Sequence, residues 1–280
     1  MIHLAREDYN KVLIPLNQVK INRMFAEAVI RKTIPGNVYV DCLEDPHAFY
    51  VLHPYGMSLL FGESGNEDFN RELVHYITNK KQKRLSQEWL QADPAGDWIA
   101  LIDSVMLTHN DSLVRDQTID VKGTSQPILR NTRVNFRFNS EAYRRTRKTI
   151  TGPDDEIVQI TKGMFMAQPG SVTARNFWRD EEHFLAEGIG YSLLSSGDIA
   201  STAFSAFIDP YKLEIGIETS EGHRGKGYAY AVCAALIDYC LEHQLEPVWS
   251  CRLENEGSYK LAQRLGFEPS LTLPYYRLAE

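Results

Sequence analysis

The chain lacks the features that mark membrane and secreted proteins. None of its apolar runs approaches the roughly 18 residues that a membrane-spanning helix needs. The N-terminus is charged from its sixth residue and has no long apolar segment, unlike a signal peptide. The four cysteines form no Cys-x-x-Cys pair, and the eight histidines show no metal-ligand spacing. We therefore expect reduced, buried thiols, no metal site and a cytoplasmic protein.

An excess of positive charge is also missing. The formal net charge is −7, which argues against bulk affinity for nucleic acid. Two basic clusters, residues 80–84 and 144–148, fit solvated helix ends or linkers better than phosphate-binding patches. Apolar residues make up 43% of the chain and charged residues 24%, as in soluble globular proteins. The 280 residues allow one large domain or two of ordinary size.

One stretch, residues 214–232, organises the rest of the chain. A strand-like first part leads into a glycine-rich turn with two cations, Arg224 and Lys226, and a helical apolar pattern follows. The unpaired amides of a first helical turn, together with the helix dipole, favour a bound anion. Gly225 and Gly227 have no Cβ to collide with that anion. The expected ligand is a pyrophosphate.

The turn does not match two common phosphate-binding motifs. Lys226 is followed by Gly227 and Tyr228, which breaks the Walker pattern, and the third glycine of the dinucleotide pattern Gly-x-Gly-x-x-Gly is missing. Arg224, Gly227 and Ala229 instead fit Arg/Gln-x-x-Gly-x-Gly/Ala. This pattern resembles the coenzyme A loop of the GNAT acetyltransferases.

Apolar periodicity predicts a mixed α/β arrangement in the first half. Expected helices cover residues 21–29, 66–79 and 87–91, and expected strands cover residues 37–42, 48–53, 57–62, 98–106 and 132–138. A break near Gly152-Pro153 suggests two domains, residues 1–140 and 141–280. The first half could be a degenerate tandem copy of the second that has lost its coenzyme site, or an unrelated mixed domain.

The second half reads as a sheet with flanking helices. Expected strands cover residues 157–166, 190–194, 199–207, 213–219, 247–252 and 271–278, the last broken at Pro274, and residues 174–187 are expected to be helical. Asn255 stands where a helix N-cap should be, and Gly266 fits the position just past that helix.

This succession resembles the core of the GNAT superfamily over about residues 157–280. A narrower resemblance, to the bacterial group that includes zwittermicin-resistance acetyltransferases, lies in Pro247-x-Trp249-x-Cys251, Asn255-x-x-Ser258-x-x-Leu-Ala262 and Leu265-Gly-Phe267. The resemblance implies an α+β (mixed α/β) GNAT fold with a central, mostly antiparallel, splayed sheet flanked by helices. It also implies an N-acetyltransferase that moves an acetyl group from acetyl-CoA to an amine by direct attack in a ternary complex.

By the same resemblance, the strand before the turn would contact the thioester and pantetheine, and the turn would hold the pyrophosphate. The residues that it assigns to the cofactor are Ile217, Glu218, Thr219, Arg224, Gly225, Lys226, Gly227, Tyr228, Ala229, Asn255 and Ser258. The acceptor would be a small-molecule amine, with neither nucleic acid nor membrane as partner. The sequence also allows a homodimer.

An amine must lose a proton before it attacks, so a base is needed. Glu214 and Glu218 share strand parity; Glu214 is the first candidate and Glu218 the second, although both also fit solvated or salt-bridged strand carboxylates. The tyrosine that usually protonates the leaving thiolate in this family is replaced by Ala262. The thiolate could leave unaided, since a simple thiol has a pKa of about 8.5. Candidate substitutes for the proton donor are Tyr259, Ser258 and Cys251.

Two other classes of protein compete with an acetyltransferase. The missing tyrosine would also fit a non-catalytic acyl-CoA-binding or sensing module. The anion turn alone would fit a nucleotide-binding protein without GNAT chemistry. Stabilisation by coenzyme A, but not by ATP or NAD, would exclude the latter, because a ligand stabilises the state that it binds.

Overall fold

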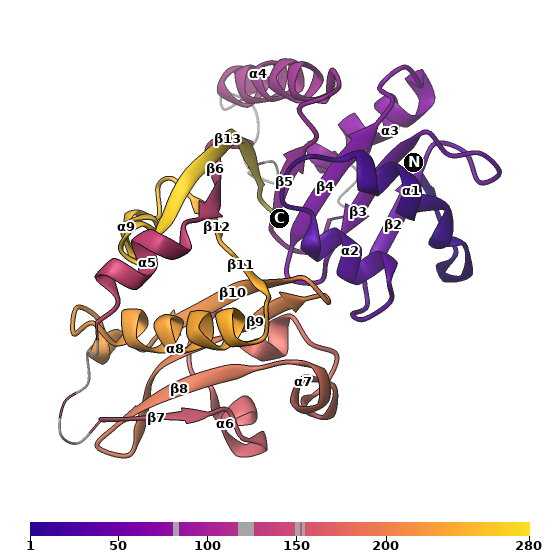
Figure 1. Cartoon of the computed structure of the whole chain (residues 1–280). Coiled ribbons are helices and arrows are strands. Elements are labelled where there is room, and N and C mark those ends of the chain that lie inside the picture. Colours follow the sequence, from indigo (N-terminus) through magenta and orange to yellow (C-terminus); the bar gives the residue numbers. More distant parts are fainter. Residues whose placement is uncertain (81–83, 117–125, 149–151, 153–154) are drawn as a thin grey trace. The chain divides into compact units, whose positions relative to one another are not determined.

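The computed structural model describes residues 1–80, 84–116, 126–148, 152 and 155–280 of the chain. These residues form two compact units (Figure 1). Unit 1 comprises Met1–Arg133 and Thr272–Glu280, and unit 2 comprises Val134–Leu271. The sequence led us to expect residues 272–280 in the second domain. They cluster with unit 1 instead, because the end of the last strand pairs with a strand of that unit.

Unit 1 is built on a mixed sheet with the strand order β1-β2-β3-β4-β5-β13. Strands β2, β3 and β4 form an antiparallel meander, and β5 pairs in parallel with β4 after the crossover helix α3. Phe69 and Leu73 of α3 pack with Trp98 of α4 in the core. The elements are β1 (Ile2–His3), η1 (Arg6–Asp8), α1 (Asn10–Gln18), α2 (Met24–Ile30), β2 (Asn37–Val40), β3 (Ala48–Leu52), β4 (Met57–Gly62), α3 (Glu67–Ile77), β5 (Glu88–Ala92) and α4 (Trp98–Asp116).

Unit 2 contains a five-stranded sheet with the order β11-β10-β9-β8-β7. All neighbours are antiparallel except β10 and β11. Its elements, with the strands β6 and β13 that lead into and out of it, are β6 (Leu129–Phe138), α5 (Ser140–Thr146), β7 (Asp155–Gln159), α6 (Lys162–Ala167), η2 (Ala174–Asn176), α7 (Glu181–Glu187), β8 (Gly190–Ser195), β9 (Asp198–Ile208), β10 (Lys212–Thr219), η3 (Glu221–His223), α8 (Tyr228–Glu242), β11 (Glu246–Val248), β12 (Ser250–Arg252), α9 (Glu256–Arg264) and β13 (Phe267–Leu278).

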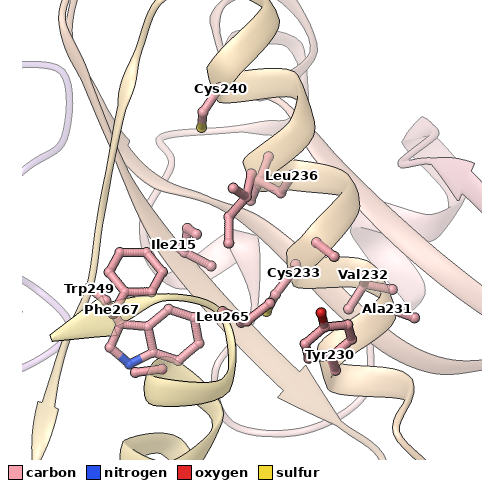
Figure 2. Close-up of a cluster of buried hydrophobic side chains, with 14 of the residues drawn as sticks. Ile215, Tyr230, Ala231, Val232, Cys233, Leu236, Cys240, Trp249, Leu265 and Phe267 are labelled. Carbon is pink, nitrogen blue, oxygen red and sulfur yellow. The ribbon is translucent and has the colours of Figure 1, made fainter. Parts of the chain in front are cut away.

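Helix α8 forms the centre of the unit 2 core. Its side chains Cys233, Leu236 and Cys240 are fully buried and pack with Ile215 of β10 (Figure 2). Burial of one large aliphatic side chain contributes about 1.5–3 kcal/mol, so this contact holds α8 firmly on the strand that precedes it. Both cysteines are free thiols, as expected from the sequence. Burial raises the pKa of the Cys240 thiol to about 12, so it acts as a packing group.

Apart from the strand expected over residues 247–252, four predictions of secondary structure were wrong. Residues 87–91 lie in strand β5 and not in a short helix, because they pair in parallel with β4. Residues 98–106 begin helix α4 and not a strand, since Trp98 and Ile102 are buried four residues apart on one helical face. The strand expected over residues 157–166 ends at Gln159, and Thr161 caps helix α6.

The fourth error concerns the end of the chain. Strand β13 runs unbroken through Pro274. Its pairing with β5 involves only residues 276–278, so β5 does not require the amide hydrogen that proline lacks.

Candidate active site

The sheet of unit 2 opens beside strand β10. Strand β9 pairs with β10 along most of its length, but β11 pairs only with residues 212–214 at its start. Beyond that point β12 follows β6 and β13 in a separate strand order. Within the described ranges, residues 215–219 of β10 therefore have no strand partner on their second edge. Such an edge can hydrogen-bond an extended ligand.

Trp249 causes this separation. It stands between β11 and β12, so the single strand expected over residues 247–252 is in fact two. Its side chain is buried, and its carbonyl accepts a hydrogen bond from the amide of Phe136 (3.1 Å). Its indole Nε1 donates to Ser258 Oγ (3.2 Å). These contacts connect the chain after β11 to β6 and α9 and not to β10.

The glycine-rich turn follows at the open end of β10. Gly225 and Gly227 have φ angles of 79° and 87°, a backbone conformation that favours glycine. Gly227 is the N-cap of α8, which has no side-chain cap and no acidic residue in its first turn. In the part of the chain that the structure describes, none of the backbone amides of residues 225–230 donates to an acceptor. A Cβ added to Gly225 would meet no atom within 4 Å, so this turn is open.

The two cations of the turn are exposed but differ in orientation. The Arg224 guanidinium folds back on β10: its Nε donates to the Thr219 carbonyl (3.2 Å), and its Nη2 lies 3.7 Å from Glu218 Oε1. Lys226 Nζ lies 5.9 Å from the centre of the Tyr228 ring. Arg224 thus stabilises the turn, whereas Lys226 adds charge near the free amides.

Tyr228 anchors the first turn of α8 to the sheet. Its hydroxyl donates to Asp155 Oδ1 (3.1 Å) and lies 3.1 Å from Ser195 Oγ. The hydrogen bond from the Gly152 amide, followed by that from Ser195, lowers the pKa of Asp155, so this partner is a carboxylate at neutral pH. Tyr228, which the resemblance assigned to the cofactor, therefore also fixes the start of α8.

The two candidate bases have different surroundings. Both carboxylates lie on the sheet face opposite α8, since Ile215 and Ile217 face the α8 core. Glu214 is buried, 7% exposed, beside the β-bulge that shifts the pairing with β9. Glu218 Oε2 instead accepts hydrogen bonds from the loop before η2, namely from the amides of Ser171 (3.1 Å) and Val172 (3.0 Å). Pro169-Gly170 marks a turn in the sequence here, but no pattern in the sequence predicted the contact of this loop with Glu218.

The remaining candidate residues lie on α9, at its N-cap or in β12. Asn255 is its N-cap, as expected, and its Oδ1 accepts from the Ser258 amide (3.2 Å). The Tyr259 ring packs edge-on against Phe136, with centroids 5.4 Å apart. Ala262, at the usual tyrosine position, is fully buried in the core, and so is nearly all of Cys251.

The donor set fits the charge of a coenzyme A pyrophosphate. Six consecutive amides, in the turn and the start of α8, offer hydrogen bonds, and the exposed Lys226 adds positive charge. The open edge of β10 begins within a few residues of this turn, as an extended pantetheine arm would require.

Among the described residues, no helix is both long and apolar enough to cross a membrane.

Comparison with known proteins gives a consistent result. The family model "GNAT acetyltransferase" matches residues 15–276, so the likeness extends well before residue 157, where the sequence resemblance began. An uncharacterized N-acetyltransferase of Bacillus subtilis, YdfB, is 25% identical over 254 residues, which cover 87% of this chain and 86% of that protein.

Two solved structures share the fold. A GCN5-related N-acetyltransferase-like protein from Streptococcus suis aligns with a TM-score of 0.66 at 20% identity, covering 96% of this chain and 98% of its own. A tandem GNAT protein from the clavulanic acid biosynthesis pathway aligns with a TM-score of 0.62 at 12% identity, covering 99% and 97%. The expected mixed α/β GNAT fold is confirmed. The chain belongs to the GNAT acetyltransferase family and is an acyltransferase.

Proposed function

We propose that this acyltransferase moves an acetyl group from acetyl-CoA to the amine of a small molecule, by direct attack in a ternary complex. The observation that carries the proposal is the row of amides at residues 225–230 without acceptors, next to the open edge of β10. Bound acetyl-CoA would supply an activated acetyl group. The amides would hold its pyrophosphate, and Lys226 would add charge.

The pantetheine and thioester would lie along the open edge of β10. Ile217 and Thr219 would contact them through the backbone, with Asn255 and Ser258 on the α9 side. Charge develops on the thioester oxygen during attack, and a fixed backbone amide stabilises such charge by about 3 kcal/mol. Holding both reactants together also removes much of the entropy cost of their encounter.

We assign the base to Glu214. A positioned base contributes roughly 10²–10⁴ in rate, directly or through water. Glu214 is buried beside the bulge of β9, where its carboxylate is shielded from bulk water. Glu218 is the weaker candidate, because two loop amides already use its Oε2. Tyr259 is the proposed proton donor to the leaving thiolate, since Ala262 leaves the usual position without one.

Thiol release from acetyl-CoA with a panel of small amines tests this function. We expect turnover with at least one amine, and loss of it in Glu214→Gln with coenzyme A affinity retained. Binding of coenzyme A without turnover of any amine would count against an amine acceptor. The narrower resemblance to zwittermicin-resistance acetyltransferases stays a prediction, and it makes amino sugars and amino-containing antibiotics useful members of the panel.

A further inference from the structure

The Glu218 carboxylate joins three parts of unit 2. It projects from β10, its Oε2 binds the loop between α6 and η2 (residues 168–173, the α6–η2 loop), and its Oε1 faces Arg224 of the glycine-rich turn. Its side chain is only 14% exposed. A solvated surface carboxylate would not be held in this way.

The contacts with the α6–η2 loop are specific. Oε2 accepts from the Ser171 amide (3.1 Å), the Val172 amide (3.0 Å) and the Ser171 hydroxyl (3.4 Å). Hydrogen bonds to a charged group are roughly twice as strong as those between neutral groups. Such a set can hold an otherwise exposed loop tip in one conformation.

Gly170 makes this approach possible. A Cβ at this position would lie 2.4 Å from Glu218 Cγ, and the residue has a φ of 96°. No other residue would allow both the close contact and the backbone conformation without strain. The loop is therefore shaped around the carboxylate, on the sheet face where Glu214 also lies.

We propose that Glu218 is a positioning residue that holds the α6–η2 loop as a wall of the amine site and links it to the cofactor turn through Arg224. The role in the amine site rests on the proposed function. If the thioester lies along residues 217–219, the loop stands one side chain away from it, on the face from which Glu214 could serve an attacking amine. The Arg224 contact makes loop order sensitive to an anion bound at the turn.

Hydrogen–deuterium exchange of the full chain tests the anchoring directly. Glu218→Ala should speed exchange of the Ser171 and Val172 amides about tenfold, because it removes their acceptor. Glu218→Gln, which keeps an oxygen acceptor without the charge, should give an intermediate rate. Glu246→Ala is the matched control: Glu246 pairs with Lys212 at the other end of β10 in an exposed ion pair. Unchanged exchange in Glu218→Ala would overturn the proposal.

Gly170→Ala provides the same test with Glu218 intact. The added methyl group should displace the loop and speed its exchange, so the proposal stays testable even if Glu218→Ala does not fold. The link to the cofactor is tested by adding coenzyme A. It should alter loop exchange in the wild type but not in Glu218→Gln, and an unaltered wild-type loop in the presence of bound coenzyme A would refute the link.

Kinetics separate positioning from catalysis. With an amine that turns over, Glu218→Gln should raise the KM for the amine about tenfold, as expected for loss of one charged hydrogen-bond network. The acetyl-CoA KM should change less than about threefold, because Arg224 is exposed and lies 3.7 Å from the carboxylate. The acidic limb of the pH–rate profile should remain. Loss of that limb with an unchanged KM would make Glu218 the base and overturn its positioning role. If coenzyme A does not bind the wild type at all, the proposed function fails, while the exchange result still decides the anchoring.

Discussion

The two units share one strand–turn–helix–strand segment but differ in the residues at its turn and helix start. In each, a three-stranded antiparallel meander leads through a glycine-containing turn into a helix, and the next strand returns parallel to the third. In unit 1 the connection runs from β4 to α3, and in unit 2 it runs from β10 to α8. From this shared order we propose that unit 1 is a degenerate copy of unit 2.

In unit 1, side chains at the start of α3 cap this helix and supply negative charge there. Asn66 is the N-cap of α3, and its Oδ1 accepts from the Phe69 amide (3.0 Å). Glu67 and Asp68 place negative charge in the first turn. A carboxylate there already interacts favourably with the helix dipole and repels a second anion. The start of α8 has neither device, and its glycine N-cap leaves the amides free.

The second edges of β4 and β10 also differ, since that of β4 is mostly paired and that of β10 is mostly open. In unit 1, β5 pairs with residues 57–60 of β4, which covers most of that strand. In unit 2, β11 leaves β10 after its third residue. The two units thus differ in two local features, the uncapped helix start and the open strand edge of unit 2, and we propose that the anion site depends on both.

Filling the turn of unit 2 with negative charge should have the largest effect. Gly225→Asp meets open space, and aspartate tolerates positive φ better than most residues. The new charge should weaken coenzyme A binding by roughly 2–3 kcal/mol, about a hundredfold, by reversing the charge preference of the helix start. Gly225→Asn is the isosteric neutral control and should lose much less affinity. Isothermal titration calorimetry measures the coenzyme A affinity of both variants, and an equal loss of affinity in the two would contradict an electrostatic site.

Acid should weaken unit 1 through a buried histidine. His53 follows β3, is fully buried, and accepts the Tyr55 amide at Nδ1 (3.1 Å). Burial lowers the pKa of His53 to about 3. Between pH about 3 and about 6.5 His53 is protonated in the unfolded state but not in the folded state. The free energy of unfolding is therefore highest above pH about 6.5 and falls by about 1.4 kcal/mol for each pH unit below it, down to the folded-state pKa.

In the turn between β9 and β10 of unit 2, the acceptor for the turn amides is Asp209 and not a histidine. Its Oδ1 accepts hydrogen bonds from the amides of Tyr211 and Lys212. His53→Asn keeps a hydrogen-bond acceptor for the Tyr55 amide and should remove the acid sensitivity of β3 and β4. Hydrogen exchange of the amides in these strands, measured at several pH values, tests this. His47→Asn, at an exposed site of the same unit, is the control. An unchanged slope in His53→Asn would show that another group titrates.

The two asparagine caps separate stability from binding. Asn66→Ala and Asn255→Ala each remove one N-cap and should each cost about 1 kcal/mol of unfolding free energy. Only Asn255→Ala should also weaken coenzyme A binding, by several-fold, because only α9 lies beside the proposed pantetheine path. Denaturant unfolding and calorimetry on both variants test this, and equal affinity in the two would remove Asn255 from the cofactor site.

The smallest effect is expected at Lys226. This side chain is exposed, so Lys226→Ala should lower coenzyme A affinity only a few-fold, or about 0.5–1 kcal/mol. The loss should shrink as salt is added, because salt screens exposed charges. A loss that persists at high salt would indicate direct, desolvated contact with the phosphate.

Local signals made part of this account predictable from sequence. Strand β10, the glycine turn and α8 follow one another within a short segment, and the Asn255 cap depends on residues three positions apart. Other features depend on distant partners. Residues 87–91 became a strand through pairing with β4, and the break at Trp249 depends on Phe136 and Ser258. The contact of Glu218 with Ser171, 47 residues away, has no local signature.

The most direct test of the central claim is a backbone-amide NMR titration of the full chain with coenzyme A. We predict saturable shifts at the amides of residues 225–230 and none at residues 66–70, where α3 starts. Absence of shifts at 225–230, or equal shifts at both helix starts, would contradict the assignment of the cofactor to the α8 turn.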